Sequence, residues 1–267
     1  MPAGDHSPAY NEAVAALVAR LADNKYFLGR HYAEWCSGAP TLESAVAAAA
    51  MAQDELGHAR ALYPLLRTLV AQPSPELEPE LEPETRTRFT SMAFLDRPLG
   101  GWQDFVAANF LVDTALTLVF AAAVTSSFGP LAGRARKVLQ EERMHRMHAD
   151  GWVSRLASEG SAVRAAFEMS LERAWPETLC WFGAPGGGDT LSSEGVLDAA
   201  PDELRARFLA AVAPTIAAAR LRLPVRRSKS GVWELTEPLP WDRWVPETYR
   251  LALGQQAHVI PDAAEES

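Results

Sequence analysis

Two Glu-x-x-His pairs constrain the fold of this chain more than any other feature: Glu55 with His58, and Glu142 with His145. Each pair lies inside a long segment whose apolar residues recur with the 3.6-residue period of an α-helix. Residues three apart on a helix share a face, so each pair can grip one metal ion. A single pair often arises by chance, whereas two pairs in corresponding segments indicate a helical bundle built around a shared centre.

The helical segments pair into two hairpins. The periodicity predicts helices over residues 7–35 and 42–70, and again over residues 101–127 and 131–158. An acidic, proline-rich stretch that begins at Gln72 predicts a solvated crossover between the hairpins. Two antiparallel hairpins joined by one long connection predict an all-α, ferritin-like four-helix bundle.

The rest of the chain adds to this bundle. Two more helices are predicted over residues 162–182 and 202–223, followed by an irregular tail over residues 226–267 that contains tryptophans and prolines. We therefore expect one domain over residues 1–267, with the core bundle at residues 7–158 and the extra helices and the tail packed on it.

Composition narrows the classes of function. The formal net charge of −9 argues against a nucleic-acid binder and against a polybasic membrane-surface protein. The chain has two cysteines, Cys36 and Cys180, whose separation excludes a disulfide framework and a cysteine-based zinc site. The first residues show no basic-then-apolar signal pattern, and we expect a cytoplasmic protein.

One segment is long and apolar enough to cross a bilayer. Residues 105–124 carry a single charge, Asp113, in a run of membrane-spanning length. A carboxylate near the bilayer centre would cost about 3 kcal/mol, and basic flanking anchors are missing. The segment is therefore predicted to be a buried helix of a protein outside the membrane, and its lone acid needs an explanation.

A bundle centre also needs a carboxylate from each helix that lacks a Glu-x-x-His pair. Residues at equal distances from the turn of an antiparallel hairpin lie opposite each other. Counting back from the two pairs reaches positions near Asp23 and near Asp113. Asp113 is the sole acid of its helix interior, where an unpaired carboxylate is costly, whereas Asp23 could equally be an ordinary solvated acid. The predicted metal ligands are Asp23, Glu55, His58, Asp113, Glu142 and His145.

Four carboxylates and two imidazoles form a ligand set that suits two iron ions, with manganese as the alternative. An additional acid precedes each pair, Asp54 before the first and Glu141 before the second. Metal-bound histidines usually donate their other N–H to a carboxylate. We expect Asp54 to orient His145 and Glu141 to orient His58 across the bundle, although two surface acids are an equally good interpretation.

Several motifs are similar to those of one known family. They are LADN at residues 21–24, EWC at 34–36, FLVD at 110–113 and LERAWP at 171–176. These motifs resemble the companion subunit in the ferritin-like subunits of bacterial phenylacetyl-CoA monooxygenase, and the resemblance covers about residues 17–223. The QDELGH motif at residues 53–58 instead resembles the catalytic subunit, which implies metal ligation by both Glu-x-x-His pairs and, by position, by Asp23 and Asp113.

The leading functional hypothesis is a di-iron oxygenase, or a subunit of one, that inserts oxygen into an aromatic acyl-CoA such as phenylacetyl-CoA. A separate reductase is expected to supply electrons, because the sequence has no flavin, nicotinamide or cysteine-cluster motif. The alternative is a non-catalytic structural subunit that pairs with a homologous catalytic subunit, and a third hypothesis is iron storage. The expected assembly is a homo-oligomer or a heterodimer with a homologous ferritin-like subunit.

Overall fold

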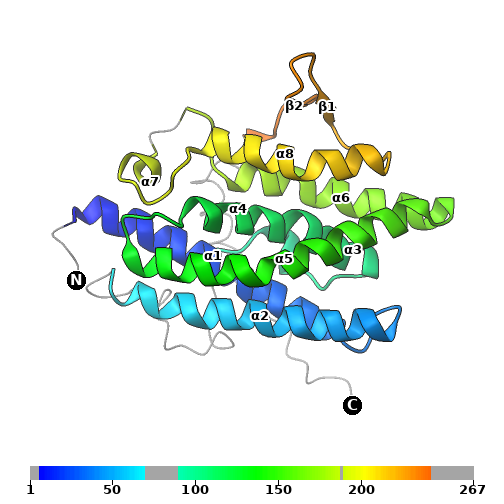
Figure 1. The fold of residues 1–267 in the computed structure, drawn as a ribbon, viewed down its shortest axis with the longest axis horizontal. Helices are drawn as coiled ribbons and strands as arrows, with labels where there is room; N and C mark the ends of the chain where they lie inside the picture. Colours follow the sequence, from blue (N-terminus) through cyan, green and yellow to red (C-terminus); the bar gives the residue numbers. More distant parts are fainter. Residues whose placement is uncertain (1–5, 70–89, 187–188, 242–267) are drawn as a thin grey trace.

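The computed structural model describes residues 6–69, 90–186 and 189–241, and it shows an all-α, ferritin-like bundle (Figure 1). Helices α1 (Pro8–Glu34) and α2 (Leu42–Leu66) form the first hairpin. Both helices begin at a side-chain N-cap: Ser7 accepts a hydrogen bond from the backbone N–H of Tyr10, and Thr41 accepts one from the backbone N–H of Ser44. Such caps satisfy N–H groups that the first turn leaves without a helical partner.

The second hairpin contains a break in its helical geometry. Its first arm runs through α3 (Trp102–Ala107), the π-helical turn η3 (Ala108–Asp113) and α4 (Thr114–Ala122) without leaving the helix axis. The second arm is α5 (Gly129–Ser158), and Pro130 lies in its first turn, where a proline interrupts no helical hydrogen bond. The predicted bundle is thus confirmed, with a π turn that the hydrophobic period did not indicate.

Three further helices cover the second hairpin on the side away from α2 (Figure 1). They are α6 (Ser161–Trp181), α7 (Thr190–Ser193) and α8 (Pro201–Ala218). A short 3₁₀ turn, η2 (Ala93–Asp96), leads into the second hairpin and contacts α1 and α6. The core is contiguous from the first hairpin to these added helices.

Helix α8 is shorter than the sequence predicted. It ends at Ala218 rather than Leu223, although it continues through Pro214. Arg220 adopts a left-handed conformation with φ of 53°, which stops the helix. The backbone N–H of Leu221 then bonds to the carbonyl of Ile216, so the last turn is closed before the chain leaves it.

The segment after α8 contains a small β-hairpin, which corrects the prediction of an irregular tail for this part of the chain. Strands β1 (Val225–Arg227) and β2 (Trp233–Leu235) pair in antiparallel fashion, with Arg226 opposite Glu234. Three-residue strands are too short to give a detectable alternation of apolar and polar residues. Residues 242–267 of the predicted tail and residues 72–89 of the predicted crossover lie outside the described residues.

The segment Trp102–Ala122 is the one helical stretch of the described residues that is long and apolar enough to cross a membrane. In the fold, 78% of its most apolar window is buried against the rest of the protein. It therefore forms the centre of the bundle core, as expected for the run around Asp113, and it carries this acid into the middle of the molecule (Figure 1).

Candidate metal centre

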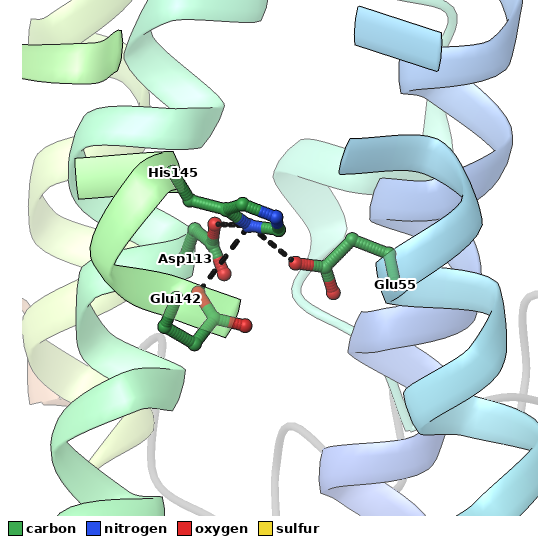
Figure 2. A group of neighbouring side chains, drawn as sticks. All are labelled: Glu55, Asp113, Glu142 and His145. Carbon is green, nitrogen blue, oxygen red and sulfur yellow. Dashed lines mark hydrogen bonds and ion pairs between the residues drawn. The ribbon is translucent and has the colours of Figure 1, made fainter. Parts of the chain in front are cut away.

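Four buried side chains converge in the middle of the bundle (Figure 2). Glu55 comes from α2, Asp113 from the end of the π turn, and Glu142 and His145 from one face of α5. One ligand atom of each lies within 4.8 Å of the others. Carboxylate oxygens and an imidazole nitrogen at this spacing could hold a metal ion. We call these four residues the carboxylate–histidine cluster.

His145 turns its two ring nitrogens in opposite directions. Nδ1 faces inward, 3.0 Å from Asp113 Oδ2 and 3.2 Å from Glu55 Oε1. Nε2 faces outward, 3.3 Å from Asp54 Oδ2 on the neighbouring helix α2. The predicted contact between Asp54 and His145 across the bundle is therefore present.

His58 has the mirrored arrangement. Its Nε2 lies 2.6 Å from Glu141 Oε2, which is the second predicted contact between helices. Its Nδ1 faces the cluster at 3.6 Å from Glu142 Oε1, and it has no hydrogen-bond partner among the described residues. Both acids that precede the Glu-x-x-His pairs thus hold a histidine ring, and their proposed role in metal binding stays a prediction.

A residue that the sequence analysis overlooked lies at the centre of the cluster. The Lys25 ammonium, from α1, is 2.9 Å from Glu55 Oε1, 2.6 Å from Asp113 Oδ1 and 2.5 Å from Glu142 Oε1. Its side chain is fully buried. An ammonium has three N–H donors, and here each has one carboxylate oxygen as its acceptor.

The structure does not bring Asp23 into the cluster, which corrects its prediction as a ligand. Its Oδ1 accepts a hydrogen bond from the hydroxyl of Tyr63 at 2.8 Å, and its Oδ2 accepts the backbone N–H of Thr90 at 2.7 Å. Residues two apart on a helix point about 200° away from each other, so Asp23 and Lys25 cannot both face the bundle axis. Counting back from the turn located the level of the centre correctly but could not select the face of the helix.

Burial and the three carboxylates act on Lys25 in opposite directions. Burial alone lowers the pKa of an ammonium, whereas Asp113, Glu142 and Glu55 raise the pKa of Lys25 well above its ordinary value. Lys25 is therefore a cation at neutral pH, and its positive charge lies where the predicted site would have held a metal.

The other charges of the cluster adjust to that cation. Burial, followed by repulsion from Asp113, raises the pKa of Glu55 to about 8. Although burial opposes it, the charges of Lys25 and His145 lower the pKa of Asp113. Burial also disfavours the charged form of His145, but hydrogen bonds to the surrounding carboxylates raise its pKa. Two cations thus face two carboxylates and a largely protonated Glu55 at neutral pH.

This donor set does not fit a pair of metal ions while Lys25 points inward. The predicted centre needs a carboxylate from each of the two helices without a Glu-x-x-His pair. Asp113 supplies one, whereas α1 supplies an ammonium, which has no lone pair to donate and which repels a cation. The ligand set of the second hairpin and α2 is present, and that of α1 is replaced.

The π turn η3 links the cluster to a second polar group. A π turn holds one residue more than an α-helical turn, and such turns are frequent at functional sites. Asn109 at its start donates a hydrogen bond to Asp113 Oδ2 at 3.3 Å, and its Oδ1 lies 3.1 Å from His148 Nδ1. The cluster therefore continues through Asn109 to His148, beside the rings of Trp102 and Trp152.

Lys25 left a signal in the sequence that could have been used. It is the one basic residue between Arg20 and Arg30, in a helix where Leu21 and Leu28 recur at the spacing of one apolar face. A cation on that face, opposite carboxylates from three other helices, is expected to pair with them. The structure confirms that Leu21, Lys25 and Leu28 are all buried.

Comparisons with known proteins agree with this architecture. A family model described as "Phenylacetic acid catabolic protein" matches residues 1–254. Two different subunits of 1,2-phenylacetyl-CoA epoxidase from Escherichia coli K12 are similar to the chain. The first is 28% identical, over 79% of this chain and 84% of that protein. The second is 27% identical, over 71% of this chain and 62% of that protein. The chain belongs to the phenylacetic acid catabolic protein family.

Proposed function

We propose that this chain is a structural subunit of an oxygenase complex of the phenylacetyl-CoA epoxidase type, where it pairs with a homologous subunit that carries the redox centre. The observation that carries the proposal is the Lys25 ammonium between Glu55, Asp113 and Glu142. Because α1 contributes a cation instead of a carboxylate, the centre has no complete ligand set for two metal ions. The similarity to two different subunits of one epoxidase supports a chain that works beside a homologue.

In this role the buried ion pairs take over a structural task that a metal performs in a metalloprotein. A bound ion ties together the helices that supply its ligands. Here Lys25 ties α1 to α2 through Glu55, to η3 through Asp113 and to α5 through Glu142. The bundle is thus cross-linked at its centre without an ion, which suits a subunit whose task is to shape and hold a partner.

The test is an activity measurement on separated and combined subunits. The purified chain is mixed with phenylacetyl-CoA, oxygen and the reductase of the same organism, with and without the homologous ferritin-like subunit of that organism. We expect no epoxide from this chain alone, a stable complex of the two homologues on gel filtration, and epoxide from the complex. Epoxide formation by this chain in the absence of its homologue would overturn the proposal.

A catalytic di-iron subunit is the second candidate, and one observation favours it. His58 Nδ1 and Glu55 Oε2 are buried, face the interior and have no hydrogen-bond partner among the described residues. Unsatisfied buried atoms of ligand type are expected where an ion binds. For two ions to bind, the Lys25 side chain would have to leave the centre. The assay above separates the candidates, because only a catalytic subunit forms product without its homologue.

A further inference from the structure

The centre of the bundle contains two kinds of donor atom, and they differ in whether Lys25 occupies them. Three carboxylate oxygens accept the three N–H groups of its ammonium, one each from Glu55, Asp113 and Glu142. Two further ligand atoms, Glu55 Oε2 and His58 Nδ1, are buried without a hydrogen-bond partner in the described residues. The orphaned atoms belong to the same α2 Glu-x-x-His pair.

Both histidine rings are already oriented as metal ligands require. Glu141 holds His58 and Asp54 holds His145 by Nε2, and each ring presents Nδ1 to the interior. Carboxylates on the outer nitrogen fix the orientation of a ligating ring and raise its basicity. The arrangement is prepared for a metal on α2, η3 and α5, and it departs from that chemistry on α1 alone.

We propose that Lys25 is the single residue that keeps this centre free of metal, and that replacing it by a carboxylate opens a latent site for a pair of divalent cations. The inference rests on the proposed function, in which the native chain needs no metal. Glutamate at position 25 would supply the missing α1 carboxylate and remove the competing charge. The ligands would then be Glu55, His58, Asp113, Glu142, His145 and the new side chain.

Electrostatics sets the size of the expected effect. Opposite and like charges a few ångströms apart interact by several kcal/mol at the effective dielectric of a protein site. The change from ammonium to carboxylate therefore alters the affinity for a divalent cation by at least about a hundredfold. A neutral replacement, Lys25→Met, removes the repulsion without adding a ligand, and its affinity should lie between the two.

The experiment measures cobalt binding by four proteins: the wild type, Lys25→Glu, Lys25→Met and Lys229→Glu. Lys229 is exposed near the β-hairpin, so its variant carries the same charge change away from the centre. Each protein is dialysed to equilibrium against Co²⁺, the bound metal is counted by mass spectrometry, and the visible absorption of bound Co²⁺ reports its coordination. We expect close to two ions in Lys25→Glu with a protein-ligand spectrum, and none in the wild type or in Lys229→Glu.

Two results would overturn the inference. One is a folded Lys25→Glu that holds no more cobalt than the wild type, and the other is a wild type that itself holds two ions. If the Lys25 variants do not fold without metal, recovery of their helical circular dichroism on adding Co²⁺ supports the inference. Failure to recover on adding Co²⁺, with the Lys229→Glu control folded, contradicts it.

The outcome for the proposed function stays separate from this test. A wild type without metal, together with a Lys25→Glu variant that gains none, removes the latent site and leaves the structural-subunit proposal in place. Epoxide formation by the wild-type chain alone overturns the function, whatever the variants bind.

Discussion

At the scale of single residues, the centre of this protein is decided by one position on α1. Lys25 is fully buried and donates to three carboxylates from three other elements. A buried charge is tolerated only when its partners are close and well oriented, and removing one partner leaves the others uncompensated. The cluster is therefore balanced as a unit, and no member can be changed without disturbing the rest.

Lys25→Met is expected to destabilise the metal-free protein by about 3–5 kcal/mol, because Asp113 and Glu142 lose their buried counter-ion. Urea unfolding followed by circular dichroism measures the change. Lys137→Met is the matched control: Lys137 is 72% exposed and lies 4.0 Å from Glu141, so its loss should change stability little. Equal stability of the two variants would show that the buried ion pairs are not a major source of stability.

His148 gives a pH-dependent prediction. Burial, followed by the charge of His145, lowers the pKa of His148 from 6.5 to about 4. Between these two values the unfolded chain binds more protons at this residue than the folded protein, so stability rises with pH across that window. The His148→Gln variant should show a shallower rise of unfolding free energy between pH 4 and pH 6.5.

Thermal or urea unfolding at several pH values measures this slope. His6→Gln serves as the control, since His6 is exposed at the start of the described residues. A slope for His148→Gln as steep as that of the wild type would mean that His148 binds its proton equally well in the folded and unfolded states.

Residue types and spacing predicted much of the centre. The Glu-x-x-His pairs, Asp113 and the histidine contacts of Asp54 and Glu141 all lie where the bundle geometry expects them. The side of α1 could not be predicted, because Asp23 and Lys25 lie within one turn and a small phase error exchanges them. Asp23 instead holds Thr90, a contact that depends on where the crossover rejoins the bundle.

At the scale of elements, the helices are predictable from period and caps, whereas the irregularities are not. The π turn η3 adds a residue within an unbroken apolar run, so the hydrophobic pattern around Phe110 and Leu111 does not reveal it. Its effect is local: it presents Asn109 and Asp113 together toward α5. The β-hairpin was missed for a similar reason, since three-residue strands leave no readable pattern.

The close packing of α1 against α2 gives an element-scale prediction. A methyl group on Gly29 would lie 2.7 Å from Leu56 Cγ and 2.9 Å from the backbone nitrogen of Leu56. Gly29→Ala must push the helices apart and should destabilise the protein by about 1–3 kcal/mol. Chemical unfolding of the variant and the wild type measures the difference.

Gly57 provides the opposite case on the same hairpin. A methyl group there meets no atom within 4 Å, and alanine is the better residue inside a helix. Gly57→Ala should therefore stabilise the protein by about 1 kcal/mol. If Gly29→Ala were as stable as Gly57→Ala, the approach of the two helices at Gly29 would be looser than the structure shows.

At the scale of the whole molecule, family and fold agree while the chemistry of the centre differs from the expectation. The chain belongs to the phenylacetic acid catabolic protein family, and its bundle has the predicted connectivity. The same bundle can hold metal ions or an internal ion-pair network at its centre, because both tie the helices together by charge. A fold of this kind therefore does not decide between a catalytic and a structural subunit; the donor types at the centre do.

The central claim is that Lys25 takes the position of a metal in the native protein. The most direct measurement is the iron content of the wild-type chain after anaerobic loading with ferrous iron and removal of excess by gel filtration. Iron well below one ion per chain, in a protein with full helical circular dichroism, is the predicted result. Two ions per chain that withstand gel filtration would contradict the claim, since Lys25 would then have left the centre.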